Sequence, residues 1–370
     1  MSVGRTYLTA ASVGLQIGVL PTGIKDAITD VEGVRVGHCT VGSAGECDVQ
    51  TGVTVVRPHG GNVFREKVIA GCHVVNGFGK SIGLMQIDEL GQLESPIALT
   101  NTLSVPAVSE GLLDHLLAEN PEIGDQTGSV NVVVAECNDS ILNDMRGRHV
   151  TRDHVLAAID AAKDGPVEQG AVGAGRGMSA FGLKGGIGTS SRLVHYDRRV
   201  ATVGVLVLSN FGALEELVIA GRAVGAVLAR ERELDTAARV GGSIIVVLAT
   251  DAPLTERQLG RLLRRAQNGI ARTGSATAHG SGELVIGFTT AVRIPHFPQD
   301  STIPLTMLRE DGEIFDRLFT AVTEATEEAI LNSMLSAETV TGRDGVRREA
   351  LPLERLAELL ALAEGWSPRG

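Results

Sequence analysis

Aromatic residues, cysteine pairs and long apolar runs are all scarce in this sequence. Only 3% of its 370 residues are Phe, Trp or Tyr, which disfavours a protein that stacks nucleic-acid bases on aromatic side chains. The four cysteines lie far apart without a CxxC pair, so we expect reduced thiols in the core or in pockets, not a disulfide framework. There is no apolar stretch of about 18 residues and no apolar core of a signal peptide, which predicts a cytoplasmic protein that does not enter the membrane.

Positive charge is also in short supply. The chain has 33 basic and 44 acidic residues, a net charge of -11, and no block of basic residues, so nucleic acid is not expected as a partner. In contrast, 43% of the residues are apolar and 46 are glycine. This composition predicts a globular protein with a sizeable core, many tight turns and close backbone contacts, which is typical of an enzyme scaffold.

The pattern of apolar residues predicts a mixture of strands and helices. Between Ala27 and Leu99, short apolar segments separated by turn residues predict a series of strands, and IGLMQI at 82–87 is one of these segments. Residues 170–191 are rich in glycine but retain apolar residues, which predicts a loop system or closely packed strands instead of a linker. Further along the chain, periodicity predicts helices at 105–119, 151–164, 214–239, 257–265, 311–336 and 352–364, and strands at 130–135, 201–208, 243–250 and 284–292.

Several residue pairs resemble parts of known site motifs but lack the required spacing. Potential metal ligands occur side by side at His38–Cys39, Cys47–Asp48 and Cys72–His73, yet none has the spacing of a zinc site, so no metal is expected. The sequence GAGRGM is one residue short of the dinucleotide fingerprint, and the G-x-S-x-G hydrolase motif is absent. His279, within TAHGSGE, is then the one candidate histidine for a catalytic triad.

Gly242 and Ser243 lie between a helical pattern and SIIVVLAT, the most apolar strand-like run of the chain. A serine at this place has two interpretations. It can simply follow a helix end, or it can become a nucleophile if the peptide bond before it is cut, because its new α-amino group, with a pKa near 8, can accept the hydroxyl proton. Glycine before the serine favours such a cut, since it has no Cβ and tolerates strained dihedral angles.

Ten segments, spread in order over most of the chain, resemble segments of one known protein family. This resemblance decides between the two interpretations of Ser243. The chain resembles the family of self-processing aminopeptidases that includes L-aminopeptidase/D-esterases and β-peptidyl aminopeptidases. The segments are AITDVEGVRVGH at 27–38, TGVTVVRP at 51–58, NGFGKSIG at 76–83, PIALTNT at 96–102, VAECNDSILND at 134–144, GAVGAGRGM and FGLKGGIGTSSR within 170–192, VLSNFG at 207–212, GGSIIVVLATDAPL at 241–254, HGSGE at 279–283 and EEAILNSML at 327–335.

The resemblance implies a fold and a processing event. The fold would be a single αββα domain over 1–370, a four-layer α/β sandwich of two stacked sheets flanked by helices, similar to ornithine acetyltransferase and related to N-terminal-nucleophile hydrolases. Cleavage between Gly242 and Ser243 would give an α-chain of 1–242 and a β-chain of 243–370 that remain associated.

The same resemblance implies roles for individual residues. Ser243 would be the nucleophile, and Ser281 and Glu283 would interact with it and with its amine. Asn210 would donate to the oxyanion, and Glu136 would bind the free amino group of the substrate.

Two positions depart from relatives of the L-aminopeptidase/D-esterase kind. Asn138 stands where a tyrosine serves as a second oxyanion donor, so its amide would have to donate from a shorter side chain. Arg176 stands where a small residue is usual, and we expect its cation to narrow the pocket or to bind a substrate carboxylate.

Together these features predict a serine aminopeptidase that removes the N-terminal residue from short peptides, amides or esters of L-, D- or β-amino acids. No metal or organic cofactor is implied, and a homotetramer of αβ units is expected from the resemblance. Two alternatives remain open, an acyltransferase of the ornithine acetyltransferase kind and an unprocessed relative without enzymatic activity.

Overall fold

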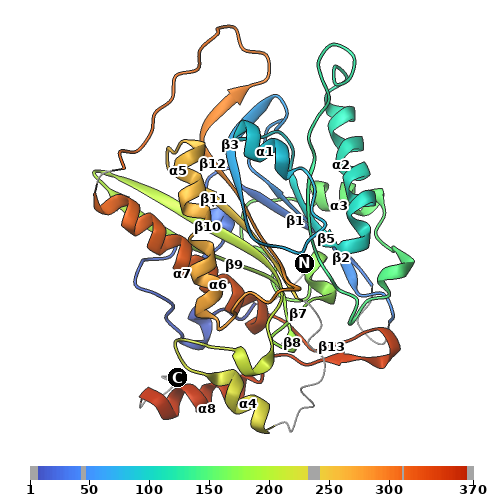
Figure 1. Ribbon diagram of the computed structural model, residues 1–370, viewed down its shortest axis with the longest axis vertical. Coiled ribbons are helices and arrows are strands. Elements are labelled where there is room, and N and C mark those ends of the chain that lie inside the picture. Colours follow the sequence, from blue (N-terminus) through green and yellow to red (C-terminus); the bar gives the residue numbers. More distant parts are fainter. Residues whose placement is uncertain (1–6, 43–46, 232–241, 311, 365–370) are drawn as a thin grey trace.

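Two β-sheets stacked face to face form the centre of the molecule, and helices cover both outer faces (Figure 1). The structure, a computed structural model, describes residues 7–42, 47–231, 242–310 and 312–364. The smaller sheet has the order β1-β2-β5-β6 and the larger one β4-β3-β12-β11-β10-β9. This arrangement is the expected layered α/β sandwich.

The strands and helices have the following bounds. The smaller sheet contains β1 (Arg35–Val41), β2 (Thr51–Arg57), β5 (Ile97–Asn101) and β6 (Val133–Cys137). The larger sheet contains β3 (Glu66–Gly77), β4 (Gln92–Leu93), β9 (Gly186–Tyr196), β10 (Arg199–Asn210), β11 (Ser243–Thr250) and β12 (Gly282–Pro295). Short ribbons pair β7 (Ser179–Ala180) with β8 (Leu183–Lys184) and β13 (Val340–Thr341) with β14 (Arg347–Arg348). The helices are α1 (Leu84–Leu90), α2 (Val105–Glu119), α3 (Arg152–Asp160), α4 (Val224–Glu231), α5 (Glu256–Leu263), α6 (Ala266–Arg272), α7 (Glu313–Leu335) and α8 (Leu353–Glu364).

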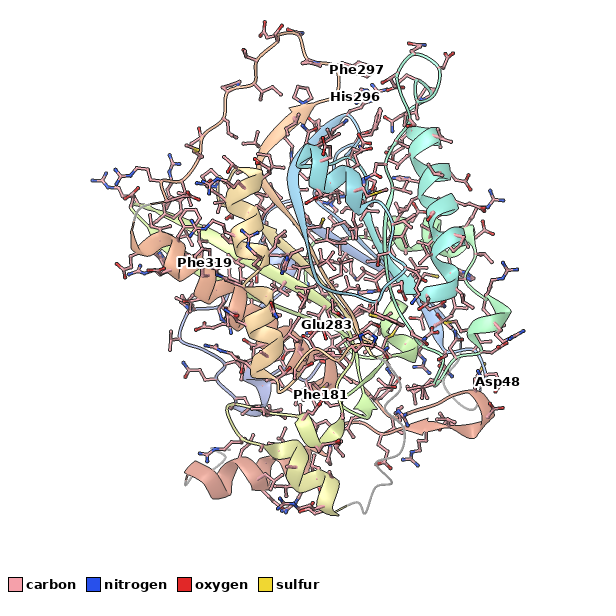
Figure 2. The ribbon with its side chains drawn as sticks, viewed as in Figure 1. Asp48, Phe181, Glu283, His296, Phe297 and Phe319 are labelled. Carbon is pink, nitrogen blue, oxygen red and sulfur yellow. The ribbon has the colours of Figure 1, made fainter. Side chains whose placement is uncertain are left out.

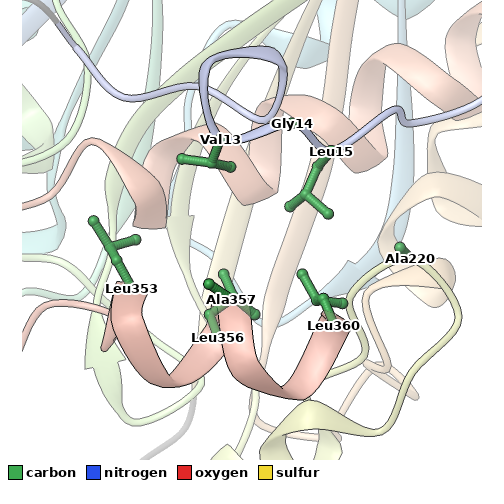
Figure 3. A pocket seen from close by; sticks show the side chains of 8 residues that line it. All are labelled: Val13, Gly14, Leu15, Ala220, Leu353, Leu356, Ala357 and Leu360. Carbon is green, nitrogen blue, oxygen red and sulfur yellow. The ribbon is translucent and has the colours of Figure 1, made fainter. Parts of the chain in front are cut away.

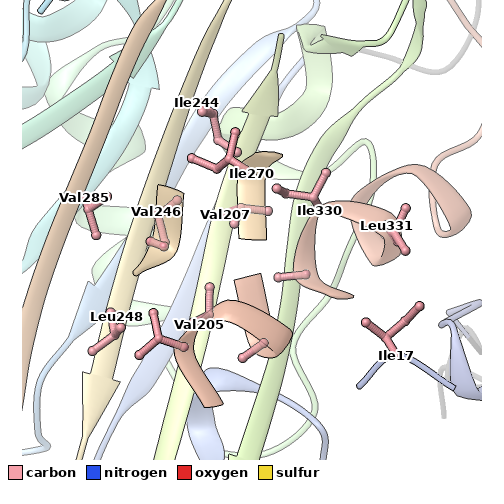
Figure 4. Close-up of a cluster of buried hydrophobic side chains, with 14 of the residues drawn as sticks. Ile17, Val205, Val207, Ile244, Val246, Leu248, Ile270, Val285, Ile330 and Leu331 are labelled. Carbon is pink, nitrogen blue, oxygen red and sulfur yellow. The ribbon is translucent and has the colours of Figure 1, made fainter. Parts of the chain in front are cut away.

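Strand β11 shows how the layers are built. Every residue from Ser243 to Thr250 is buried, as expected for a central strand covered on both faces. Side chains alternate between the two faces of a strand, so Ile244, Val246 and Leu248 pack against the layer of α6 and α7, as Figure 4 shows. The alternate residues, among them Ile245 and Val247, pack in the core between the two sheets. Ser243 has the parity of the second set, which directs its side chain towards the smaller sheet.

Two of the expected elements are wrong. The single helix expected at 214–239 is a 3-10 turn (Leu214–Glu216), an irregular segment and then α4, while 232–239 lie outside the described residues. Ala220 and Gly221 have φ angles of 49° and 75°, which interrupt a right-handed helix. Gly225 packs on the turn so closely that a Cβ there would lie 1.8 Å from the Leu214 carbonyl oxygen.

The segment 82–87, expected as a strand, instead forms the start of α1 after Gly83, whose φ is 87°. An apolar run of this length has no period that separates a strand from a helix. A Cβ at Gly83 would lie 2.2 Å from the Val132 carbonyl oxygen, so the close passage of another segment, which the local sequence does not show, determines the turn.

The C-terminal helix α8 packs on its own chain. Its residues Leu353, Leu356 and Leu360 face Val13 and Leu15 of the N-terminal segment around a small apolar cavity of about 70 Å³ (Figure 3). Leu356 is 3% exposed and belongs to the core under the larger sheet. The apolar face of α8 thus closes the core of the same molecule.

The described helices include none that is both long and apolar enough to cross a lipid bilayer. The parallel strands β11 and β12 both begin at the same edge of the larger sheet, where Ser243 is the register partner of Gly282. Figure 2 shows that Glu283, beside this edge, and His296, after the other end of β12, are far apart. The sequence-predicted site residues converge on the edge where these two strands begin.

Candidate active site

Ser243 lies where the two sheets meet. It is buried, and its hydroxyl oxygen accepts a hydrogen bond of 3.3 Å from the backbone N–H of Asn138, which follows β6 of the smaller sheet. The carbonyl oxygen of the preceding Gly242 accepts a hydrogen bond of 3.1 Å from the Gly282 N–H. The Ser243 hydroxyl oxygen and the carbonyl oxygen of the peptide bond before it therefore each accept a hydrogen bond from a neighbouring backbone amide.

Ser281 and Glu283 begin the neighbouring strand. The Ser281 hydroxyl donates to one oxygen of the Glu283 carboxylate at 3.0 Å, and the Thr277 hydroxyl donates to the other at 2.8 Å. Burial raises the pKa of Glu283, and these two hydrogen bonds oppose the shift. The carboxyl group is thus desolvated at the residue that follows Gly282, the register partner of Ser243.

Asn210, the last residue of β10, is the register partner of Ser243 on the other side. Its side-chain oxygen accepts from the Ser179 N–H at 2.8 Å, and its NH₂ group donates to the Asn138 carbonyl oxygen at 2.8 Å. An amide NH₂ group carries two N–H bonds, and this contact uses one of them. The other can meet a substrate oxygen at the strand end, in agreement with the expected oxyanion role.

Asn138 contacts both Ser243 and Asn210 through its backbone. Its N–H donates to the Ser243 hydroxyl, and its C=O accepts from the Asn210 amide. Its side-chain oxygen accepts from the Ser140 N–H at 2.9 Å and so closes a local turn. The expected role of the side-chain NH₂ group as an oxyanion donor stays a prediction.

Glu136 lies two residues earlier on β6 and is 4% exposed. One oxygen of its carboxylate accepts from the Lys80 backbone N–H at 2.8 Å, and the other accepts from the Thr102 hydroxyl. Gly79 lies between this carboxylate and the start of β12. A Cβ built on Gly79 would lie 3.7 Å from the carboxylate and 4.0 Å from the Gly282 Cα. The Glu136 side chain is therefore held in place beside the start of β12, the strand next to β11.

The expectation for Arg176 is wrong, because its guanidinium is bound by the protein itself. Arg176 is 7% exposed, and it donates to the Gln50 side chain at 2.6 Å and to Glu338 at 3.3 Å. It lies in the 3-10 turn Gly173–Gly177, whose carbonyl oxygens, with those of neighbouring residues, bind the fully buried Lys184 ammonium. Arg176 thus helps to hold the glycine-rich turn and has no part exposed enough to bind a substrate carboxylate.

The other candidates from the sequence lie apart from this cluster or at its rim. The His38 ring contacts the Thr54 hydroxyl at 2.9 Å, and burial lowers its pKa to about 4. All four cysteines are free, and Cys137 is buried. Within the described part of the chain, no three His, Cys, Asp or Glu side chains are arranged to hold a metal ion. His279 is exposed, with its ring 6.1 Å from that of Phe78.

Sequence reasoning missed Thr277, Thr102 and Lys80 as members of the site. Each lies in a separate segment, and each is defined only by its contact with Glu283 or Glu136. The segment NGFGKSIG was noticed as a matching stretch, but nothing in it indicated a contact with β6. Only the topology, which brings the end of β3 next to β6 and β12, supplies that signal.

Comparison with known proteins agrees with this arrangement. Residues 26–348 match the model of peptidase family S58. The β-peptidyl aminopeptidase BapA of Sphingosinicella xenopeptidilytica is 40% identical over 354 residues, which cover 91% of this chain and 87% of the relative.

Two solved structures have the same fold over nearly their whole length. The PH0078 protein from Pyrococcus horikoshii OT3 aligns with a TM-score of 0.90 and 49% identity over 96% of this chain and 99% of that one. The L-aminopeptidase D-Ala-esterase/amidase from Ochrobactrum anthropi, described as a variant of the Ntn hydrolase fold, aligns with a TM-score of 0.87 and 35% identity over 96% and 98%.

Proposed function

Because the chain belongs to peptidase family S58 and is an aminopeptidase, we propose that it cuts itself between Gly242 and Ser243 and then uses Ser243 as the nucleophile of peptide hydrolysis. One observation carries the proposal. The Ser243 hydroxyl, the Glu283 carboxyl group and the Asn210 amide lie at the same end of three neighbouring strands of the larger sheet, and the Glu136 carboxylate lies on β6 of the smaller sheet.

Self-cleavage would begin with attack of the Ser243 oxygen on the Gly242 carbonyl carbon. The Gly282 N–H is placed to stabilise the negative charge that develops on the Gly242 oxygen, because it already donates to that atom. The C–N bond then breaks, its nitrogen takes up the proton, and an ester joins Gly242 to the Ser243 hydroxyl oxygen. Water hydrolyses the ester, which leaves a carboxylate on Gly242 and a free amino group on Ser243.

Hydrolysis of a substrate would repeat the acyl transfer with a different carbonyl group. The substrate ammonium binds Glu136, and the Ser243 oxygen attacks the first carbonyl carbon while the new α-amino group accepts the hydroxyl proton. Asn210 donates to the oxyanion, and Glu283 holds or exchanges the proton of the α-amino group. The leaving amine takes a proton as the C–N bond breaks, and water then releases the acyl group.

The acyl-enzyme is the intermediate that an experiment can capture. Purified protein is mixed with an aminoacyl ester, quenched in acid within the first turnovers and analysed by intact mass. We expect the fragment that begins at Ser243 to gain the mass of one aminoacyl group. An unmodified fragment during active turnover would contradict the mechanism, and transfer to an added amine in place of water would indicate the acyltransferase alternative.

Location and assembly form a separate part of the proposal. We expect short peptides, amides and esters as substrates and a cytoplasmic homotetramer of αβ units, as the family resemblance implies. Light scattering coupled to gel filtration measures the mass directly, and a monomeric αβ unit would contradict this part alone.

A further inference from the structure

The Lys80 side chain stands beside the proposed binding place of the substrate amino group and has no role in the mechanism above. Its backbone N–H donates to Glu136, but its ammonium group points elsewhere, 4.5 Å from the centre of the Phe78 ring. Lys80 and Phe78 are both exposed, at the end of β3. The quadrupole of an aromatic ring attracts a cation to the ring face, so the Phe78 ring holds the ammonium at the surface just after β3.

This ammonium has no carboxylate partner within the residues that the structure describes. Two lysines elsewhere in the chain are bound by the protein: Lys67 pairs with Glu94 at 2.6 Å, and Lys184 donates to three carbonyl oxygens. The Glu136 carboxylate accepts hydrogen bonds from the Lys80 backbone N–H and from Thr102, but it forms no ion pair with the Lys80 ammonium. A fixed carboxylate and a separate cation without a partner thus lie next to each other.

A short peptide carries the complementary pair of charges. Two extended residues span about 7 Å, so a dipeptide whose ammonium lies on Glu136 places its carboxylate within about one lysine side-chain length of that site. The Lys80 backbone N–H donates to the Glu136 carboxylate, so the Lys80 side chain starts beside Glu136 and its ammonium can reach this range. A longer peptide would carry its carboxylate beyond it.

We propose that the Lys80 ammonium, held over Phe78, binds the C-terminal carboxylate of dipeptide substrates while Glu136 binds their amino group. This inference rests on the proposed function, because it takes Glu136 and Ser243 as the places of the amino group and the reacting carbonyl. It makes the enzyme select dipeptides with a free carboxylate over their amides and over longer peptides. Since the contact is exposed, added salt weakens it.

The test compares a dipeptide with its C-terminal amide. The first residue is the one cleaved best among α-, β- and D-aminoacyl amides, and glycine is the second. In the wild-type protein we expect kcat/KM to be about tenfold higher for the dipeptide at low salt, mainly through KM, because one charge-assisted hydrogen bond is gained. The preference should shrink as the salt concentration rises.

Variants assign the preference to the side chain. Lys80→Met should lose the preference, with kcat/KM falling far more for the dipeptide than for the amide, and Lys80→Arg should retain most of the preference. The matched control is Lys163→Met, which removes another exposed lysine, after α3, and should leave both substrates unaffected. Cleavage of the amide also shows that each variant is folded and processed.

The results distinguish failure of the Lys80 role from failure of the proposed function. Equal kcat/KM for dipeptide and amide in the wild-type protein, or an unchanged preference in Lys80→Met, would overturn the role of Lys80 and leave the proposed function intact. A protein that cleaves neither substrate would overturn the proposed function and the inference with it.

Discussion

Asn210 and Ser243 stand directly opposite each other on the antiparallel strands β10 and β11, and both contact Asn138. The Asn138 N–H donates to the Ser243 hydroxyl, while the Asn138 carbonyl oxygen accepts from the Asn210 amide. One residue after β6 thus connects the proposed nucleophile with its expected oxyanion donor. The smaller sheet thereby helps to hold the proposed catalytic groups of the larger one in place.

Replacing Asn210 by alanine removes the expected oxyanion donor. We expect kcat to fall about 10²- to 10³-fold, with a smaller effect on KM, because the lost hydrogen bond strengthens as charge develops on the substrate oxygen. Steady-state kinetics on the processed fraction of the variant measure this effect. Asn268→Ala, at an exposed position of α6, is the control, and a kcat within a few-fold of the wild type would rule out the assigned role.

Replacing Glu136 by glutamine removes the negative charge but keeps the side-chain size. We expect kcat/KM for substrates with a free amino group to fall about 10- to 100-fold, mostly through KM, because a charge-assisted hydrogen bond to the ammonium is lost. Discrimination against N-acetylated substrates should fall by the same factor. The exposed Glu89→Gln serves as the control, and unchanged discrimination in Glu136→Gln would show that another group binds the amine.

We expect the protonation of Glu283 to set the acidic limb of the pH–rate profile. Burial raises its pKa above the ordinary value for glutamate, so the carboxylate that accepts a proton is lost as the pH falls, at a higher pH than an exposed glutamate would give. We expect Glu283→Gln to lower kcat about 10²-fold and to abolish the acidic limb of the pH–rate profile.

Thr277→Val removes one hydrogen bond to the same carboxylate. It should raise the pKa of Glu283 further and shift this limb to higher pH. A limb that stays in place in both variants would assign it to another group.

We expect the protonation of Asp139 to make the free energy of unfolding depend on pH. It is fully buried next to Asn138, and burial raises its pKa to about 7 despite hydrogen bonds that include one from Asn143. The folded state therefore holds a proton that the unfolded chain has already released, and the free energy of unfolding falls as the pH rises from about 4 to about 7.

Asparagine at position 139 resembles the protonated acid. We expect Asp139→Asn to reduce the loss of stability between pH 5 and pH 8 by on the order of 2 kcal/mol. Urea unfolding in a Ser243→Ala background, which keeps the chain in one piece, measures this difference. The exposed Asp153→Asn is the control, and an identical pH dependence in Asp139→Asn and its parent would disprove the assignment.

Local sequence patterns predicted the strands and helices whose apolar residues follow one clear pattern. The apolar run SIIVVLAT forms β11 with the expected bounds, and the periodic segment 105–119 forms α2. The pattern failed at 214–239, where Gly225 approaches Leu214, and at 82–87, where Gly83 approaches Val132. In both places a contact between separate segments overrides the local preference, and periodicity carries no information about such contacts.

The site was predictable only in part, for a similar reason. The place of Gly242 and Ser243 before a buried strand left two interpretations open, and the family resemblance selected Ser243 as the nucleophile and supplied Asn210, Glu136, Ser281 and Glu283. Thr277 and Lys80 are ordinary loop residues whose importance comes from their contacts with Glu283 and Glu136. Arg176 was misjudged because Gln50 and Glu338, which bind its guanidinium, lie far away in sequence.

Self-cleavage at Ser243 is the claim on which the account rests, and intact mass spectrometry of the wild type and of Ser243→Ala tests it most directly. We expect the wild type to give two fragments, 1–242 and 243–370, that copurify. Ser243→Ala should give a single chain of 38.7 kDa, because the alanine side chain cannot attack the Gly242 carbonyl carbon. An uncut wild-type chain that still hydrolyses aminoacyl amides, or cleavage at the same bond in Ser243→Ala, would contradict it.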